Sequence, residues 1–164
     1  MAVRPVTEEE FAAVVKINTD AEAYLNSQAT LTVGDLRELR RLAGYFKVAC
    51  VDRAVAGFLI AVRSGTSHAD PNYRWFSARY PEFLYIDRIV VDAGFRGRKL
   101  GSALYTDLFS VARVSGAPFV TCEIDFDPPN HASSAFHAGF GFTEVGRHAV
   151  DGGKKTVSLQ VAPV

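Results

Sequence analysis

The sequence is poor in cysteine, and each of its two thiols stands alone in an apolar stretch. Cys50 and Cys122 are the only cysteines in 164 residues, and they lie far apart in the chain. A disulfide framework or a cysteine-based metal site needs more cysteines at closer spacing. Two buried free thiols are therefore expected, and a reducing, cytoplasmic compartment is predicted.

Charge of either sign is not in excess, because 18 basic residues are balanced by 18 acidic ones. A formal net charge of zero gives no electrostatic reason to expect a nucleic-acid partner or binding to an anionic membrane. Apolar runs long enough to span a membrane are absent, and residues 1–5 are not followed by the apolar core of a secretory signal. No metal is predicted, because the histidines lack the spacing of a metal site (His68, His131, His137 and His148).

What is present is typical of one globular domain over residues 1–164. The hydrophobic fraction is 48%, and a chain of this length buries roughly 70% of its unfolded surface, so a sizeable core is expected. The first half predicts a short strand at residues 2–6 and then a helix opened by a capping box from Thr7 to Glu10. A second helix is predicted from Thr32 to Gly44, with residues 20–31 ambiguous. Strands follow at residues 45–51 and 54–63, and residues 64–81 are predicted to be a long loop.

The second half alternates strands and helices. Strands are predicted at residues 83–91 and 119–125, with a helix between them that runs from Leu100 to a stop at Gly116. A short helix at residues 130–138 and two strands at 142–150 and 154–161 complete the chain. The strand–helix–strand unit predicts a parallel pair, and the hairpins at either end predict antiparallel ones. We therefore expect an α/β (mixed α+β) fold, with six to seven strands in a mixed sheet and about four helices.

The turn between the strand at 83–91 and the following helix is rich in glycine and cations. Arg96, Arg98 and Lys99 stand where the dipole of a helix disfavours positive charge, because the first N–H groups of a helix have no partners within it. Glycine lets a ligand approach the backbone closely, so a bound phosphate is predicted to offset the cations. The alternative is a solvated basic turn. Neither a Walker A loop nor a dinucleotide fingerprint is present, which indicates another phosphate-bearing cofactor.

Two motifs resemble the GNAT superfamily of N-acetyltransferases, over about residues 82–145. The first is Arg96-Gly97-Arg98-Lys99-Leu100-Gly101, which resembles the family pattern Gln/Arg-x-x-Gly-x-Gly/Ala; Lys99 replaces the inner glycine. The second runs from Asn130 to Gly141-Phe142 without a gap and places His137 where the family usually has a tyrosine, the presumed general acid. Over residues 1–60 only the order of elements agrees with the family.

The resemblance implies a GNAT-like fold with a splayed parallel strand pair, and acetyl-CoA as the cofactor. The backbone of Ile89, Val90 and Val91 would line the acyl and pantetheine arm, and one of its amides would polarise the thioester carbonyl. Asn130, with Phe136 and His137 nearby, would contact the pantetheine. The pyrophosphate would be held by seven consecutive residues: Arg96, Gly97, Arg98, Lys99, Leu100, Gly101 and Ser102.

Acyl transfer to an amine needs a proton acceptor for the amine and a proton for the leaving thiolate. His137 is the predicted acid, because a histidine can carry a proton near neutral pH. The alternatives are that His137 only packs or only contacts the cofactor, with water protonating the thiolate. Asp87, on an otherwise apolar strand, is the first choice of base; the alternative is an ion pair with Arg88. Glu123 and Asp125 are rivals that either serve as base or bind a cationic substrate, and a water chain is a further alternative.

The aromatic loop at residues 64–81 is expected on the acceptor side, with Asn72, Tyr73, Arg74 and Trp75 as predicted substrate contacts. The alternative is that Trp75 and Phe76 fill a small satellite core under the loop. The predicted activity is transfer of an acetyl group from acetyl-CoA to a primary amine, on a small molecule or a peptide. A non-catalytic acyl-CoA-binding module and a nucleotide-binding regulator are the alternatives. The edge strands near residues 142–161 are candidates for pairing in a homodimer.

Overall fold

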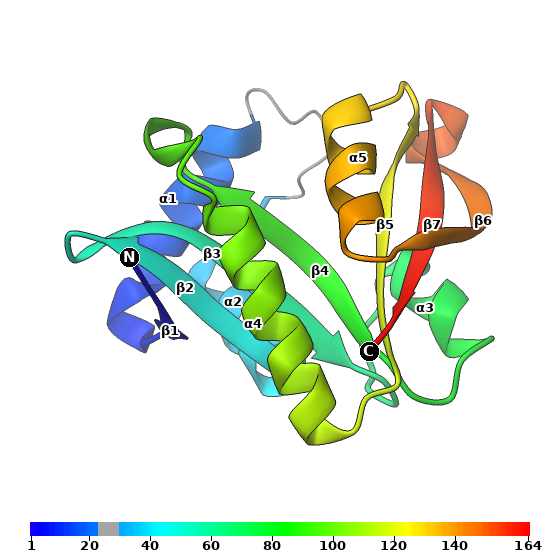
Figure 1. Ribbon diagram of the computed structural model, residues 1–164, viewed down its shortest axis with the longest axis horizontal. Coiled ribbons are helices and arrows are strands. Elements are labelled where there is room, and N and C mark those ends of the chain that lie inside the picture. The colour runs from blue at the N-terminus through cyan, green and yellow to red at the C-terminus, as the bar shows by residue number, and fades with distance from the viewer. Residues whose placement is uncertain (23–29) are drawn as a thin grey trace. The chain divides into compact units, whose positions relative to one another are not determined.

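The computed structural model describes residues 1–22 and 30–164, which form two compact units. The first unit is Met1–Val62 with Ile86–Val111, and the second is Arg63–Tyr85 with Ala112–Val164. Each unit is therefore built from two separate stretches of chain. The strands form a seven-stranded sheet in the order β1-β2-β3-β4-β5-β7-β6, which contains parallel and antiparallel pairs (Figure 1). The mixed α/β fold is thus confirmed, whereas the single domain stays a prediction.

Strands β1 (Ala2–Pro5), β2 (Ala43–Val51) and β3 (Ala54–Arg63) form the antiparallel part of the first unit. Asp52 and Arg53 join β2 to β3 with φ angles of 49° and 67°, as a tight hairpin with the right-handed twist of its strands requires. Strand β4 (Leu84–Val91) comes next in the sheet, and the N–H of Asp92, just beyond it, donates to the carbonyl of Ala56 at 2.8 Å. The end of β4 is therefore fixed against β3.

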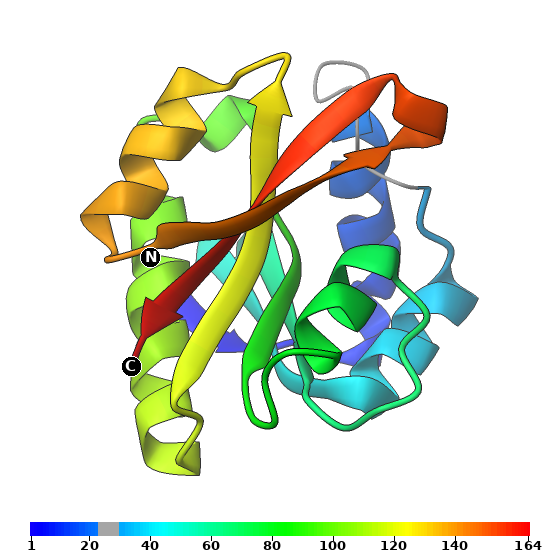
Figure 2. The ribbon, with the colours of Figure 1, turned by 90° about the vertical axis from the view of Figure 1, so that its right-hand side faces the viewer.

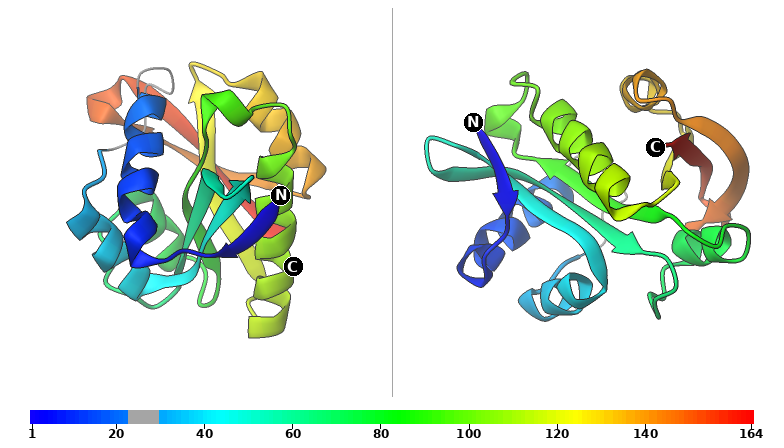
Figure 3. Two further views of the ribbon diagram at one scale, coloured as in Figure 1. Left: turned by 90° about the vertical axis from the view of Figure 1, so that its left-hand side faces the viewer. Right: turned by 60° about the horizontal axis from the view of Figure 1, so that its bottom comes forward.

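Helices cover both faces of the sheet in the first unit. The short 3-10 helix η1 (Glu8–Glu10) and the helices α1 (Phe11–Glu22) and α2 (Val33–Leu42) lie on one face, and α4 (Leu100–Ser115) lies on the other (Figure 3).

The capping boxes that open η1 and α2 form at Thr7 with Glu10 and at Thr32 with Asp35. The prediction that Gly44 ends α2 was wrong, because the helix stops at Leu42 and Gly44 already belongs to β2. Most of the ambiguous stretch at residues 20–31 lies outside the described residues.

The second unit holds β5 (Phe119–Asp127), β7 (Lys155–Pro163) and β6 (Thr143–Val150), which pair antiparallel in that order, and the start of β4. β4 runs parallel to β5, with Leu84 opposite Val120 and Tyr85 opposite Thr121. Helices α3 (Pro71–Ser77) and α5 (His131–Gly139) lie on opposite faces of these strands (Figure 2). The predicted strand–helix–strand crossover and terminal hairpin are therefore confirmed.

Helix α3 corrects the prediction of a long irregular loop at residues 64–81. Asp70 caps the helix, since its Oδ1 atom accepts from the N–H groups of Asn72 and Tyr73 at 2.9 and 3.0 Å, and Pro71 occupies the first turn. Both are favourable starts for a helix, but the helix is only seven residues long and is flanked by glycine, serine and proline. It is therefore a fifth helix where about four were expected.

Among the described residues, no helix combines the length and apolarity needed to cross a membrane.

Candidate active site

The turn that precedes α4 presents backbone amides and positive charge together. Asp92 opens it by accepting the N–H of Gly94 at 2.8 Å, which shapes the 3-10 helix η2 (Ala93–Phe95). Gly97 and Lys99 then adopt φ angles of 79° and 60°. The first hydrogen bond of the helix runs from the N–H of Ala103 to the carbonyl of Lys99, so the N–H groups just before it begin the helix without a partner in it.

The side chains of this turn suit an anion. Arg96, Arg98 and Lys99 are exposed, and the first turn of α4 holds no acidic residue. Arg98 also lies with its guanidinium 5.3 Å from the ring centre of Phe95. A phosphate group is typically held by N–H groups at the start of a helix, by residues in a left-handed conformation that make the backbone accessible, and by cationic side chains. This turn has all three features. The turn therefore suits an anionic group such as a phosphate.

Lys99 occupies the place of the motif glycine and keeps a glycine-like conformation. A left-handed conformation costs a residue with a Cβ about 1 kcal/mol or more. The replacement therefore preserves the backbone path of the turn and leaves a strained residue within it.

Asp87, the first choice of base, lies in an ion pair on β4. Its Oδ2 atom accepts from Nε of Arg88 at 3.0 Å, and both side chains are about nine-tenths buried. Arg88 also donates through Nη1 to the side-chain oxygen of Asn18 on α1, at 3.1 Å. A buried carboxylate that is paired in this way is a weak proton acceptor, because protonation would leave the guanidinium without its counter-ion. The geometry therefore matches the ion-pair alternative for Asp87.

His137 on α5 has a defined tautomer. Its Nδ1 atom lies 2.7 Å from the carbonyl oxygen of Ser133, which can only accept, so Nδ1 carries the hydrogen. Burial lowers the pKa of His137 below its usual value, and the bond to Ser133 opposes this in part. The ring is therefore mainly neutral near pH 7, with Nε2 as its acceptor atom. As a general acid it would first have to take up a proton that its surroundings disfavour.

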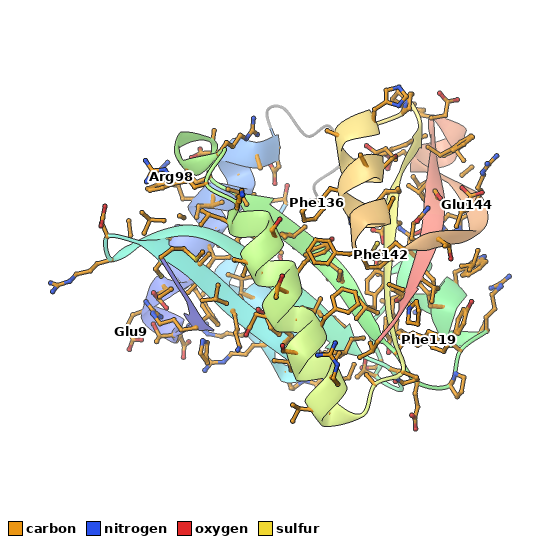
Figure 4. All side chains as sticks on the ribbon, viewed as in Figure 1. Glu9, Arg98, Phe119, Phe136, Phe142 and Glu144 are labelled. Carbon is orange, nitrogen blue, oxygen red and sulfur yellow. The ribbon has the colours of Figure 1, made fainter. Side chains whose placement is uncertain are left out.

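The surroundings of His137 are aromatic. Its ring lies edge-on to those of Phe136 and Phe142, with centroids 5.5 and 5.3 Å away. Figure 4 labels these two phenylalanines. Asn130 caps α5 by accepting the N–H of Ser133 at 3.1 Å. The predicted pantetheine contact at Asn130 therefore shares its side chain with a helix cap.

Two of the four predicted substrate contacts on α3 face inward. Asn72 is buried, and its side-chain oxygen meets Nε2 of His148 on β6. Tyr73 is also buried, and its hydroxyl donates to the carbonyl of Arg63 at 2.8 Å. Both residues therefore hold α3 in place.

Arg74 and Trp75 differ from these two. Arg74 is exposed, and a substrate contact there stays a prediction. Trp75 is half-buried and lies against Gly146 of β6, where a Cβ would come within 2.5 Å of the indole ring. Arg79 covers the ring at 3.8 Å from its centre.

The acidic residues of β5 have different partners. Asp125 forms an ion pair with Lys155 of β7 at 2.7 Å, which offsets its charge. Glu123 instead accepts a hydrogen bond from the hydroxyl of Tyr85, between Oε2 and the phenol oxygen, at 2.8 Å. The Tyr85 oxygen also lies 3.1 Å from Oδ1 of Asp70. The hydroxyl that donates to Glu123 is thus a neutral group.

Three of these residues were missed by the sequence analysis: Asp70, Tyr85 and Lys155. Tyr85 stood in an apolar strand and Asp70 in a presumed loop, so neither carried a local signal. Cys122, beside Glu123, is fully buried, and burial followed by the nearby charge of Glu123 raises the pKa of its thiol. A thiol held protonated in this way is not a nucleophile.

Comparison with known proteins supports the family and the fold. Residues 11–142 match the sequence model of the acetyltransferase (GNAT) family, which uses acetyl-CoA. Curated proteins give no significant match by sequence.

Solved structures resemble the chain over nearly all its length. Ard1 from Thermoplasma volcanium superposes with a TM-score of 0.78 at 19% identity, covering 99% of this chain and 97% of that one. The ribosomal-protein-alanine N-acetyltransferase from Brucella melitensis gives 0.75 at 21% identity, with all of both chains covered. The yncA protein of Salmonella typhimurium, solved with its cofactor acetyl-CoA, gives 0.73 at 20%, covering 99% and 92%. At these identities the likeness concerns the fold alone.

Proposed function

Because the chain belongs to the acetyltransferase (GNAT) family, we propose that it transfers an acetyl group from acetyl-CoA to a primary amine. The amine attacks the thioester directly in a ternary complex, and its carrier is a small molecule or a peptide. The observation that carries the proposal is the turn before α4, where Gly97 and Lys99 open the backbone beside three cations and an acid-free helix start.

Acetyl-CoA supplies the activated acetyl group, and this chain supplies the residues that hold it. Residues 96–102 are proposed to hold the pyrophosphate, and the backbone of residues 89–91 the acyl and pantetheine arm. Asn130, Phe136 and His137 are proposed as further contacts of that arm. For His137 the tautomer favours a role as hydrogen-bond acceptor over that of general acid, so the proton of the leaving thiolate is proposed to come from water or from the reacting amine.

For the base we propose Glu123 over Asp87. A general base must be ionised near pH 7 and able to accept a proton without losing a counter-ion. Asp87 faces Arg88 at 3.0 Å, whereas Glu123 is bonded to the neutral hydroxyl of Tyr85. Asp125, with Lys155 as its partner, is proposed to take no part in proton transfer.

A non-catalytic acyl-CoA-binding module is the second candidate. The observation in its favour is that Asp87 and His137 are both committed to partners within the protein. The two candidates share the phosphate turn and differ in whether an amine is acetylated. We also propose that the protein is cytoplasmic and that it forms a homodimer. The homodimer is proposed because β6 is an edge strand of the sheet and could pair with the same strand of a second copy.

Calorimetry with acetyl-CoA, free coenzyme A and ATP tests the cofactor. We expect both CoA species to bind and ATP to bind at least tenfold more weakly. Gly101→Trp should abolish binding, because the indole would cover the amides at the start of α4, while Ser115→Trp, at the exposed far end of the same helix, should leave binding intact. Equal binding of ATP would favour a nucleotide-binding regulator. An amine screen then separates the acetyltransferase from the binding module.

A further inference from the structure

Gly57 of β3 lies where a side chain would collide with the backbone of β4. A Cβ at Gly57 would come within 2.9 Å of the carbonyl oxygen of Val90 and 3.4 Å of the Cα atom of Val91. The φ of Gly57 lies outside the positive range that favours glycine, so the reason for a glycine here is space and not backbone conformation. Glycine within a strand often marks a place where another backbone approaches closely. Gly57 is therefore the point at which β4 comes closest to β3 through the lack of a side chain.

The residue before Gly57 forms a β-bulge. In the ladder of β2 and β3, Ala49 is opposite Gly57 and Cys50 is opposite Val55, so Ala56 is the extra residue. A bulge bends its strand and changes the direction of its polar groups, and bulges are frequent next to active sites. The bulge at residues 56–57 is thus a local device that alters how β3 meets its other neighbour.

That other neighbour is β4, which lies beside β3 in the sheet (Figure 1). The carbonyl of Ala56 accepts the N–H of Asp92 at 2.8 Å, and Gly57 faces the backbone of Val90 and Val91. Two residues of β3 therefore contact three consecutive residues at the end of β4. The end of β4 also belongs to the same compact unit as β3, so the path of its backbone is set by this strand.

The same contacts define which way the polar groups of β4 point. Successive peptide groups of a strand point alternately to its two edges. The N–H of Asp92 points toward β3, where it is bound, and the carbonyl of Val90 points there too, since it faces Gly57. The N–H groups of Ile89 and Val91 consequently point away from β3. A displacement of β4 from β3 would move these two groups as well.

We propose that the bulge at residues 56–57 is a positioning element for acetyl-CoA, with Gly57 as its positioning residue, an inference that rests on the proposed function. The carbonyl of Ala56 holds Asp92, and the lack of a side chain on Gly57 lets the next two residues back along β4 lie close to β3. The backbone of residues 89–91, which is proposed to hold the acyl and pantetheine arm, is thereby fixed before the cofactor binds. Fixing a site in advance strengthens binding, because less freedom is lost when the ligand arrives.

The bulge also reaches the phosphate turn. Asp92, which is held by Ala56, accepts the N–H of Gly94 through Oδ1 at 2.8 Å and so shapes the start of η2. The proposed sites of the arm and of the pyrophosphate therefore share one anchor on β3.

Calorimetry with acetyl-CoA tests the role of Gly57. The atom that a Cβ would meet first is a backbone oxygen, which cannot turn aside as a side chain can, so β4 has to shift in Gly57→Ala. We expect acetyl-CoA to bind about tenfold more weakly, the effect of losing about one hydrogen bond to the arm. Affinity equal to that of the unchanged protein would overturn the proposal.

Ala61→Gly is the matched control. Ala61 is fully buried in the same strand, and its replacement lowers stability without adding an atom beside β4. We expect this variant to bind acetyl-CoA as the unchanged protein does. A loss of affinity as large as that of Gly57→Ala would show that binding follows the stability of β3, and would overturn the positioning role.

Spectra of the free protein provide a readout that needs no ligand. In ¹H–¹⁵N NMR, Gly57→Ala should shift the amide signals of Val90, Val91 and Asp92 more than other signals outside β3, and Ala61→Gly should not. Signals of these three residues that stay in place would show that β4 accepts the Cβ without moving, and the proposal would be wrong.

A second pair of variants decides the matter if Gly57→Ala does not fold. The φ of Asp92 is −57°, which proline also adopts. Asp92→Pro removes the N–H that Ala56 accepts, whereas Asp92→Ala keeps it, and both lose the side chain that accepts from Gly94. We expect Asp92→Pro to bind acetyl-CoA about tenfold more weakly than Asp92→Ala, again the effect of about one hydrogen bond. Equal affinities would contradict an anchor at Ala56.

The unchanged protein separates this proposal from the proposed function. If it does not bind acetyl-CoA, the proposed acetyl transfer falls, and the role of the bulge falls with it. If it binds acetyl-CoA and the variants bind equally well, only the positioning role is lost and the acetyl transfer stands.

Discussion

The turn before α4 and the group of Asp70, Tyr85 and Glu123 are built in opposite ways. The turn uses the backbone of one continuous stretch, where Gly97 and Lys99 adopt positive φ angles and the helix amides follow at once. The group uses side chains alone, and Tyr85 stands 15 residues from Asp70 and 38 from Glu123. One feature depends on local conformation and the other on the register of strands.

This difference predicts how each feature responds to change. A site formed by the backbone tolerates a change of side chain as long as the φ and ψ angles of the turn stay the same. A group of side chains fails when one member loses its functional atom, or when the element that carries it moves. The following predictions separate the two cases, beginning with the largest effect.

Removal of the Glu123 carboxylate should be the most damaging change. We expect Glu123→Gln to lower kcat/KM for an amine by about 10²–10⁴-fold, the usual contribution of a general base, with acetyl-CoA affinity unchanged in calorimetry. Asp87→Asn should lower kcat/KM less, and should destabilise the fold because Arg88 loses its partner. If Asp87→Asn proves the more damaging of the two in steady-state kinetics, Asp87 is the base after all.

A side chain at position 146 should disturb the packing of α3 against β6. A Cβ there would lie 2.5 Å from the ring of Trp75, so Gly146→Ala should lower the free energy of unfolding by about 2 kcal/mol in urea. Gly139→Ala is the matched control, since its Cβ would meet nothing within 4 Å and its helical position favours alanine. Equal stability of the two variants would show that Trp75 moves aside without cost.

The strain at Lys99 should be relieved by glycine. Lys99→Gly is expected to raise the free energy of unfolding by about 1 kcal/mol, because glycine has no Cβ and adopts a φ of 60° without the steric cost that lysine has there. Lys99→Ala keeps the Cβ and removes the ammonium, so the pair separates conformation from charge. Acetyl-CoA affinity that falls equally in both variants would show that the ammonium binds the cofactor, whereas unchanged affinity would assign binding to the backbone.

The smallest expected effect is the pH dependence of stability from His137. Because burial lowers its pKa in the folded state, the unfolded chain binds more protons, and stability falls as the pH drops below about 6.5. In His137→Phe this loss should be reduced between pH 7 and 5, measured as the change in Tm. His131→Gln, at an exposed position of the same helix, should behave as the unchanged protein. A pH dependence that persists in His137→Phe would contradict the neutral, buried ring.

The sequence was sufficient where one stretch of chain carries its own signal. The start of α2 at Thr32, the short helix predicted at residues 130–138 and the hairpin turn at Asp52 and Arg53 are local, because caps and tight turns depend on neighbours within a few residues. The fold followed from these signals and from the resemblance at two motifs. Helix α3 was missed because seven residues show too little periodicity to stand out among glycine, serine and proline.

The base candidates show where sequence reasoning stops. Asp87 and Glu123 both stand in apolar strands, so composition could not separate them. What separates them is their partners. Arg88 follows Asp87 directly on β4, so the sequence could offer that ion pair as an alternative, whereas Tyr85 reaches Glu123 from another strand and depends on register. In the sequence, Tyr85 cannot be distinguished from any other aromatic residue of the core. Only the fold places its hydroxyl between the carboxylates of Asp70 and Glu123.

The interleaving of the two units has a consequence for how the chain is made. The first unit ends at Val111, so all of its residues have been synthesised while the last third of the protein is still to come. The second unit begins at Arg63, yet its central strands β5 and β7 are the 119–127 and 155–163 stretches. During synthesis, Asp70 and Tyr85 must therefore wait for Glu123. Glu123 is made 38 residues after Tyr85, so the contact between them cannot form until most of the chain has been synthesised.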